Sequence, residues 1–326
     1  MAISSSLGSS ALLPAGLGFR NRIINGGFDV WQRSTSAAIG AGSYVAADRW
    51  YTYRSVAGST FSRQTASLVG FQYSGRIARD SANTSTVNIS CGQSIESNNS
   101  IPLAGQTVVF SFWAKAGANY SATSNILRVR LLSSTTTDQN IVLNGGVTVI
   151  DQNATLTTSW QRFSYSAVVS SSAVTLGTIF SYDPTGTAGA ADNFEITGVQ
   201  LEQNYQPTPF EQRPIGVELA LCQRYYVQYG ASDSEEVLCT GATYATSATY
   251  AVGHHPVEMR RRPDLSVDTN ATRLYIAGGA FYYTATSYNQ GKKTFGLFHG
   301  GGTPTAGQSG FISTAANLYV KFSAEL

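Results

Sequence analysis

Several segments of the chain alternate strictly between hydrophobic and polar positions. In residues 161–169, Phe163, Tyr165 and Ala167 alternate with arginine and serine side chains. In residues 127–131, three aliphatic residues alternate with two arginines. A third run places hydrophobic side chains at Val108, Phe110, Phe112 and Ala114. A period of two predicts strands with one buried face and one solvated face.

Clusters of Gly, Asn, Ser and Thr separate these segments, for example at residues 97–100, 133–140 and 144–146. Such clusters are typical of turns between short antiparallel strands. Many short strands between residues 23 and 210 predict a β-sandwich or jelly roll. No repeat of fixed period is visible, which argues against a β-helix or a propeller.

One segment has helical spacing instead. Pro214 is placed where a first-turn proline is tolerated. An i, i+4, i+7, i+11 stripe follows it, made by Ile215, Leu219, Cys222 and Tyr226. Further apolar residues lie beside the stripe, and a single sandwich would bury only one of the two faces. The second face predicts a helix packed between domains or along a symmetry axis.

The 326 residues exceed one typical domain and divide into four parts. We expect an all-β protein with an N-terminal arm, a jelly-roll or β-sandwich domain, a short connecting helix and a smaller β-sandwich-like domain. The predicted bounds are residues 1–22, 23–210, 211–229 and 230–326, in that order. Ten of the 18 tyrosines lie from Tyr225 onward, so the last domain is rich in aromatic side chains that carry a polar group.

Composition narrows the class of protein. Only 12% of residues are charged, and the net charge of +2 gives no reason to expect nucleic acid as a partner. No apolar run approaches the ~20 residues that a membrane helix needs, so we expect no membrane insertion. The apolar patch at residues 11–13 has no basic segment before it, which makes a poor secretion signal. The three cysteines, Cys91, Cys222 and Cys239, are expected to be free and mostly buried, consistent with assembly in a reducing host cytoplasm.

Signatures of enzymes are missing from the sequence. There is no G-x-S-x-G, no H-E-x-x-H and no P-loop. His254 and His255 are adjacent, so a strand would point them to opposite faces. We expect a protein without catalytic residues, although folding could still bring together two carboxylates of a polysaccharide hydrolase.

Seven phrases along the chain resemble the signature of bacteriophage tail-fibre and appendage proteins. They are residues 25–33 (NGGFDVWQR), 47–50 (ADRW), 110–116 (FSFWAKA), 158–163 (TSWQRF), 192–202 (DNFEITGVQLE), 209–214 (PFEQRP) and 218–226 (ELALCQRYY). The resemblance covers residues 20–230 strongly and the remainder more loosely. It implies a carbohydrate-binding-like sandwich followed by a small terminal β-domain.

The resemblance also implies a biological setting. The protein would be a homotrimer in the phage tail, with residues 1–22 docked on a tail adaptor or another virion protein. The terminal domain would face the host and bind a cell-surface glycan. The helix stripe from Ile215 to Tyr226 would then lie on the trimer axis.

Three groups of residues are candidates for function. Aromatic rings and amides suggest a glycan patch in the terminal domain at Tyr282, Tyr288, Asn289 and His299. The resemblance to carbohydrate-binding sandwiches suggests a structural calcium held by Asp29 and Asp192, the alternative being that both cap turns. The arginine run at residues 260–262 is expected at a solvated strand edge, or in contact with an anionic sugar.

Other classes of protein stay open on the sequence alone. A capsid head fibre or decoration protein would differ only in the surface that the arm meets. A polysaccharide-degrading tailspike would reveal itself by hydrolysis. A free carbohydrate-binding module should be a monomer with a secretion signal.

Overall fold

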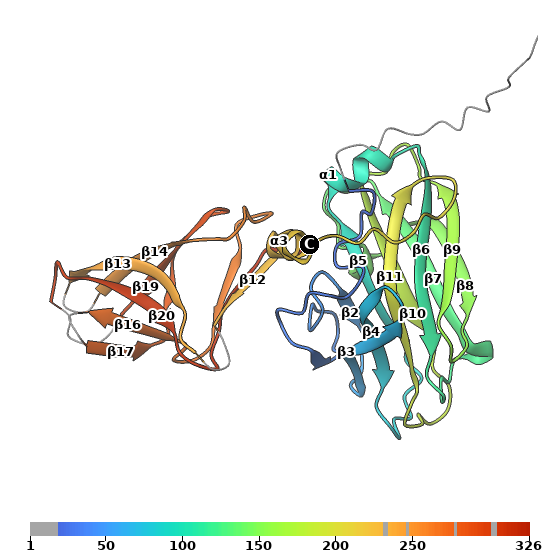
Figure 1. Cartoon of the computed structure of the whole chain (residues 1–326), viewed down its shortest axis with the longest axis horizontal. Coiled ribbons are helices and arrows are strands. Elements are labelled where there is room, and N and C mark those ends of the chain that lie inside the picture. Colours follow the sequence, from blue (N-terminus) through green and yellow to red (C-terminus); the bar gives the residue numbers. More distant parts are fainter. Residues whose placement is uncertain (1–18, 231–233, 246–247, 277–278, 301–304) are drawn as a thin grey trace, which may run out of the picture.

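The computed structural model describes residues 19–230, 234–245, 248–276, 279–300 and 305–326, with the side chains of residues 279–283 and 287–288 excepted. The predicted arm lies outside these ranges up to residue 18. Figure 1 shows two β-rich lobes with a short helix between them. The predicted all-β fold class is confirmed.

The first lobe is a sandwich of two antiparallel sheets. The six-stranded sheet has the order β1 (Ser36–Ala38), β3 (Ser59–Leu68), β4 (Phe71–Arg79), β11 (Asn193–Gln203), β6 (Thr107–Ala116) and β9 (Gln161–Val168). The five-stranded sheet has the order β2 (Tyr51–Tyr53), β5 (Ile89–Ile95), β10 (Thr175–Tyr182), β7 (Ile126–Ser134) and β8 (Val147–Thr155). Short helical turns connect them: α1 (Ser97–Ser100), η1 (Ile101–Leu103), η2 (Thr123–Asn125) and α2 (Ile141–Asn144).

The core of this lobe lies between the two sheets. Phe110 and Phe112 of β6 meet Phe180 of β10 there, with ring centroids 5.6 and 4.8 Å apart. Val108 and Ala114 are buried on the same face, as the alternation predicts. Residues of β9 alternate regularly between half-buried and exposed. These predicted strands are confirmed.

The helix α2 packs on the outer face of the five-stranded sheet. Ile141 and its neighbour Val142 lie over Gly177 of β10 and Gly92 of β5. A Cβ on Gly177 would come within 2.6 Å of the Ile141 Cβ, so the close approach of helix and sheet requires glycine there. The centre of this face is therefore covered by the chain itself.

The second lobe contains two further antiparallel sheets. One has the order β12 (Tyr226–Tyr229), β21 (Val320–Ser323) and β15 (Asp264–Val267). The other has the order β17 (Gly279–Tyr283), β16 (Thr272–Ile276), β20 (Ser309–Thr314), β13 (Val237–Ala245), β14 (Ala248–His254), β19 (Thr294–His299) and β18 (Thr286–Gln290). Their shared core contains Val227, Phe322, Phe295 and Ile312.

The connecting helix α3 covers Ile215–Gln223 and is shorter than predicted. Tyr226 is not helical, because it begins β12 and pairs with Ser323. The terminal domain therefore starts at Tyr226, within the stretch that we predicted as linker. The predicted stripe is divided among different environments: Cys222 is buried in a cluster with Ile24 and Tyr225, whereas Ile215 is exposed.

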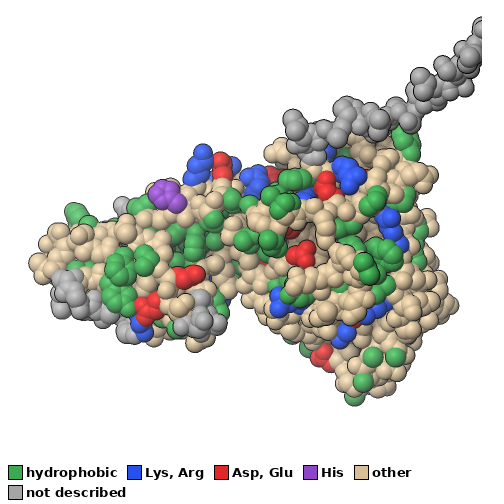
Figure 2. All heavy atoms as spheres, viewed as in Figure 1, with side chains coloured by type: hydrophobic (Ala, Val, Ile, Leu, Met, Phe, Trp, Pro, Cys, Tyr) green, Lys and Arg blue, Asp and Glu red, His purple; other side chains and the backbone are tan. Residues whose placement is uncertain are grey.

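All three cysteines are free and buried, as expected. Figure 2 shows a surface made mainly of polar and backbone atoms, with charged side chains scattered over both lobes. Among the described helices, none has the length and apolar character needed to span a membrane.

Candidate functional site at the domain junction

Buried arginines and carboxylates connect the two lobes. Arg49 lies two residues before β2 and is 1% exposed. Its guanidinium pairs with Glu325 of the chain's last segment, donates to the Ser94 carbonyl oxygen at 2.8 Å and lies 3.6 Å from the centroid of the Tyr225 ring. Buried charges persist when they are paired and hydrogen-bonded in this way.

Arg33 makes a parallel set of contacts. Its Nη2 donates to Glu325 at 3.0 Å, and its Nη1 lies 3.3 Å from Asp48. The guanidinium also lies 3.6 Å from the centroid of the Tyr226 ring. Two arginines of the sandwich thus hold both ends of the terminal domain. They contact Tyr225 and Tyr226 where the chain enters this domain and the Glu325 carboxylate where the chain leaves it.

Asp48 lies beneath Arg33 and is fully buried. Burial raises its pKa to about 6, even though Arg33 and hydrogen bonds from Gln32 favour the ionised form. The Gln32 backbone N–H donates to one Asp48 oxygen at 2.6 Å, and the Gln32 side-chain amide also donates to the Tyr226 carbonyl oxygen at 3.0 Å. Asp48 therefore positions the residues that receive β12.

A second group of contacts joins the lobes beside α2. Arg260 donates to Asp138 at 3.0 Å and to the carbonyl oxygens of Ala324 and Glu325 at 2.9 and 2.7 Å. Arg224 pairs with Glu96 at 2.7 Å. The arginine run was predicted at a strand edge; it lies instead in the turn between β14 and β15, and Arg260 is a junction residue.

Three of the seven phrases that carry the resemblance meet at this junction, and a fourth lies beside α3. Residues 25–33 and 47–50 supply Arg33, Asp48 and Arg49, and residues 218–226 supply Arg224 and the two tyrosines. In residues 209–214, Glu211 accepts from the backbone N–H groups of Arg20 and Asn21 at 3.0 and 3.1 Å. This phrase therefore anchors the start of the described chain next to α3.

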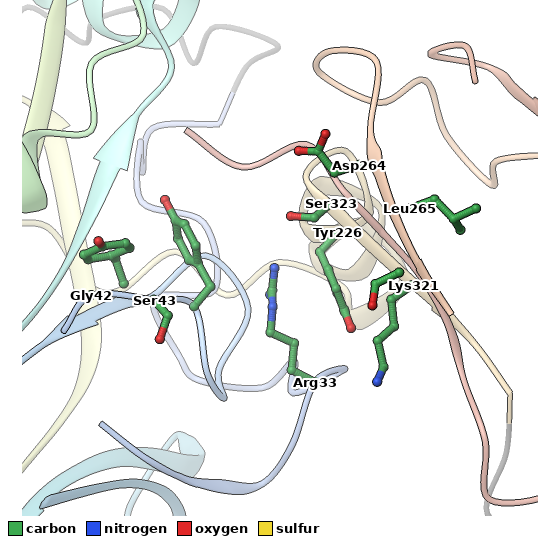
Figure 3. A pocket seen from close by; sticks show the side chains of 11 residues that line it. Arg33, Gly42, Ser43, Tyr226, Asp264, Leu265, Lys321 and Ser323 are labelled. Atoms are coloured by element: carbon green, nitrogen blue, oxygen red, sulfur yellow. The ribbon is translucent and has the colours of Figure 1, made fainter. Parts of the chain in front are cut away.

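A cleft opens between the lobes beside the buried charges (Figure 3). It has a volume of about 430 Å³. One wall is the sandwich segment at residues 42–44 with Tyr51, and the other is the outer face of the three-stranded sheet. Arg33 extends between the two walls (Figure 3). The terminal-domain wall consists of Tyr226, Asp264, Leu265, Ser266, Lys321 and Ser323.

The aromatic residues of the cleft are held in place by packing. Tyr44 and Tyr51 contact each other edge to face, with centroids 5.1 Å apart, and the Arg33 guanidinium lies 5.6 Å from the Tyr44 ring. Burial raises the pKa of Tyr44 above its ordinary value, and the nearby Glu325 carboxylate adds to this shift. The Tyr44 hydroxyl therefore stays protonated, and it donates to the Leu326 carbonyl oxygen at 3.5 Å.

The residues predicted for a glycan patch are not brought together in this cleft. Asn289 is exposed and lines a separate hollow of about 260 Å³ with Val252 and Thr294. The side chains of Tyr282 and Tyr288 lie outside the described part of the chain. His299 is buried, with 1% exposure, so its predicted place in a surface patch is wrong.

The two predicted calcium ligands have different surroundings. Asp192 is fully buried and pairs with the Arg79 guanidinium at 2.8 Å, while its oxygens also accept from the Ser121 N–H and hydroxyl at 2.9 and 2.8 Å. An arginine thus occupies the place of a cation at Asp192, and these contacts fit the alternative that it stabilises local turns. Burial and the Glu218 carboxylate raise the pKa of Asp29 to about 6. No group of three or more potential metal ligands occurs within the described ranges.

Sequence reasoning missed the residues of the cleft itself. Arg33 lies in a quoted phrase, and Lys321 and Ser323 lie in the closing strand, but nothing in the sequence pairs them. Lys321 and Ser323 join Tyr226, Asp264 and Ser266 on one wall because β12 and β15 both pair with β21. Arg33 reaches this wall through its contact with the Tyr226 ring. No local pattern in the sequence encodes contacts over such separations.

Comparisons with solved structures give likenesses to carbohydrate-binding-module sandwiches over about half of this chain. No family model and no curated protein match the chain. A CBM4 structure is 18% identical, with 55% of this chain and 98% of that chain covered and a TM-score of 0.35. The CBM61 module bound to β-1,4-galactotriose is 14% identical, with 57% of this chain and 100% of that chain covered and a TM-score of 0.33. The enzymatically active domain of tailspike protein 4 of bacteriophage CBA120 is 16% identical, covering 57% of this chain and 22% of that chain, with a TM-score of 0.33. Values this low give no ground for assigning a ligand or an activity.

Proposed function

We propose that this protein is a non-catalytic tail fibre or similar appendage of a phage virion. In this proposal the N-terminal arm attaches to the virion, the sandwich acts as a rigid shoulder, and the terminal domain contributes to recognition of a host-surface glycan. Three copies would act together, because several weak sites on one rigid support raise avidity without a strong single contact.

One observation carries the proposal. Three of the seven phrases that resemble the appendage family, residues 25–33, 47–50 and 218–226, meet in the buried contacts of Arg33, Asp48 and Arg49 with the terminal domain. These residues have a structural task, which is to fix one β-domain against another. A surface appendage that presents a binding domain at a defined angle requires this kind of rigid junction, whereas catalysis does not.

Binding to bacterial cells tests the proposal. Fluorescently labelled full-length protein is incubated with a panel of bacterial strains, and bound label is measured by flow cytometry. We expect binding to particular strains, its loss after periodate oxidation of the cell-surface glycans, and no release of reducing sugar. Binding that survives periodate would contradict glycan recognition, and released reducing sugar would favour a tailspike enzyme.

Immunogold electron microscopy of phage particles that encode the chain tests its location. Label at the tail supports a tail fibre. Label spread over the capsid would instead support a head fibre or decoration protein.

A further inference from the structure

We propose that the cleft between the two lobes binds a neutral saccharide of about two sugar rings. This inference rests on the proposed function and gives it a specific site. It moves the expected glycan contact from the predicted patch around Asn289 to the junction.

The strand register creates one continuous binding wall. Asp264 and Ser266 of β15 pair with Ser323 and Lys321 of β21, and Tyr226 of β12 pairs with the same Ser323. Directly paired residues share a face of an antiparallel sheet, and so do residues two positions apart. These five side chains therefore lie on the outer face of the sheet, while Phe322 and Val320 point into the core.

The opposite wall adds aromatic surface and further polar groups. This wall is lined by Ser43, Tyr44 and Tyr51, of which Tyr44 is half-buried and Tyr51 is 6% exposed. Sugars present C–H faces that pack on aromatic rings and hydroxyls that both donate and accept hydrogen bonds. Tyrosine and serine side chains supply both kinds of contact. The volume of about 430 Å³ lies within the ~300–1,000 Å³ of small-molecule sites.

The charges around the cleft favour a neutral ligand. Lys321 pairs with Asp268 at 2.8 Å, and Asp264 pairs with Arg261 at 2.7 Å. Arg33 is compensated by Asp48 and Glu325. A charged sugar would have to compete with these pairs for its counterion, whereas a neutral sugar can use the remaining hydrogen-bonding capacity without breaking them.

The outer face of the five-stranded sheet of the sandwich is a poorer candidate. Its centre, over β5 and β10, is covered by α2, which contacts Gly92 and Gly177 directly. The junction cleft, in contrast, is open and combines tyrosine and serine side chains of the sandwich with polar side chains of the terminal domain.

Saturation-transfer difference NMR on the full chain tests the site. The probes are lactose, maltose, cellobiose, mannobiose and chitobiose, with 3′-sialyllactose as the anionic match to lactose. We expect transfer to at least one neutral probe and at least fivefold weaker binding in Ser266→Trp, because Ser266 is exposed on the cleft wall and the indole would fill the space. The matched control is Ser164→Trp, an exposed strand serine of the six-stranded sheet outside the cleft.

Each result decides the inference. No transfer to any neutral probe, or equal binding in Ser266→Trp and wild type, overturns the saccharide site. Tenfold tighter binding of sialyllactose than of lactose overturns the inference that the ligand is neutral.

Cell binding by flow cytometry keeps the two proposals separate. If Ser266→Trp binds cells as wild type does, in a periodate-sensitive way, the cleft assignment fails and the appendage function stands. If the wild-type chain binds a disaccharide in the cleft but no cells, the appendage function fails instead.

Discussion

At the scale of single residues, this chain pairs arginines with buried carboxylates, one of which was a predicted calcium ligand. Arg79 neutralises Asp192 inside the sandwich, and Arg49 neutralises Glu325 at the junction. Guanidinium groups suit such positions because they donate several hydrogen bonds in a fixed plane and stay charged when buried. Only 12% of the residues are charged, and several of them form buried ion pairs that stabilise the fold.

Replacing Arg49 tests the energetic weight of the junction. Arg49→Met keeps much of the apolar volume but leaves the nearly buried Glu325 with Arg33 alone. Breaking a buried pair from one side costs about 3–5 kcal/mol, so we expect a loss of that size in the free energy of unfolding, measured by urea denaturation. The control is Arg128→Met, because the partner of Arg128, Asp151, is solvent-accessible. This variant should lose less than about 1 kcal/mol of the free energy of unfolding. Equal losses in the two variants would contradict a special role for the junction.

Asp29 gives the stability a predictable pH dependence. Burial and Glu218 raise its folded pKa to about 6 from an ordinary value of 3.8, so the folded state binds the proton more tightly. The stabilising contribution of the protonated form is full below pH 3.8 and is lost as the pH rises through 6. Asp29→Asn should therefore be more stable than wild type at pH 7, by about 1 kcal/mol after allowance for solvent screening of a half-buried group.

The free energy of unfolding of Asp29→Asn and wild type, measured at pH 4 and at pH 7, tests this prediction. The gain should vanish at pH 4, where wild-type Asp29 is already protonated in the folded state. If Asp29 bound calcium, Asp29→Asn would instead lose a stabilisation that added calcium gives to the wild type.

At the scale of elements, the packing of α2 on the five-stranded sheet requires two glycines, Gly92 and Gly177. Helix and strand propensities do not predict glycine at these positions. Gly177→Ala would place a Cβ against Ile141, and overpacking of this kind costs about 1–3 kcal/mol. The α2 segment also supplies Asp138 to Arg260 and Asn140 to the Leu326 carbonyl oxygen. We therefore expect Gly177→Ala to lower the melting temperature and to increase amide exchange in residues 324–326.

A matched glycine variant controls for the change in backbone entropy. Gly40→Ala adds a Cβ with nothing within 4 Å and should leave both the melting temperature and the exchange rates unchanged. If Gly177→Ala behaves like Gly40→Ala, the close contact between α2 and β10 does not support the junction.

Local patterns predicted the elements wherever one face of a strand meets the core. The alternation at Phe110 and Phe112 was enough, because burial on one face fixes a period of two. The same reasoning failed at Tyr226, whose helical spacing from Cys222 is real but whose backbone pairs with Ser323. A strand partner almost a hundred residues away decides between helix and strand there, and only the folded chain reveals it. The meeting of Arg49 with Glu325 is hidden from the sequence for the same reason.

At the scale of the whole molecule, the proposed trimer would need a contact surface other than the predicted helix stripe. Cys222 of α3 is buried within the chain, and Leu219 packs against the same cluster, so little of the predicted axial stripe is left for a neighbour. The outer face of the seven-stranded sheet is a better contact surface. It exposes Val252 and Phe311, which lie on the same cross-strand row through Thr240.

Light scattering on the purified chain checks the trimer and its surface together. We expect a mass near three times the chain mass of 34.7 kDa. Val252→Lys should reduce it to that of one chain, because three lysines cannot be buried unpaired at an apolar contact. Ile215→Lys, an equally conspicuous change on the exposed start of α3, should leave the trimer intact. The opposite result for the two variants would restore the helix as the axis. A wild-type mass of one chain would remove the trimer, and with it the avidity argument for weak glycan sites, leaving a single-copy binding module as the better description.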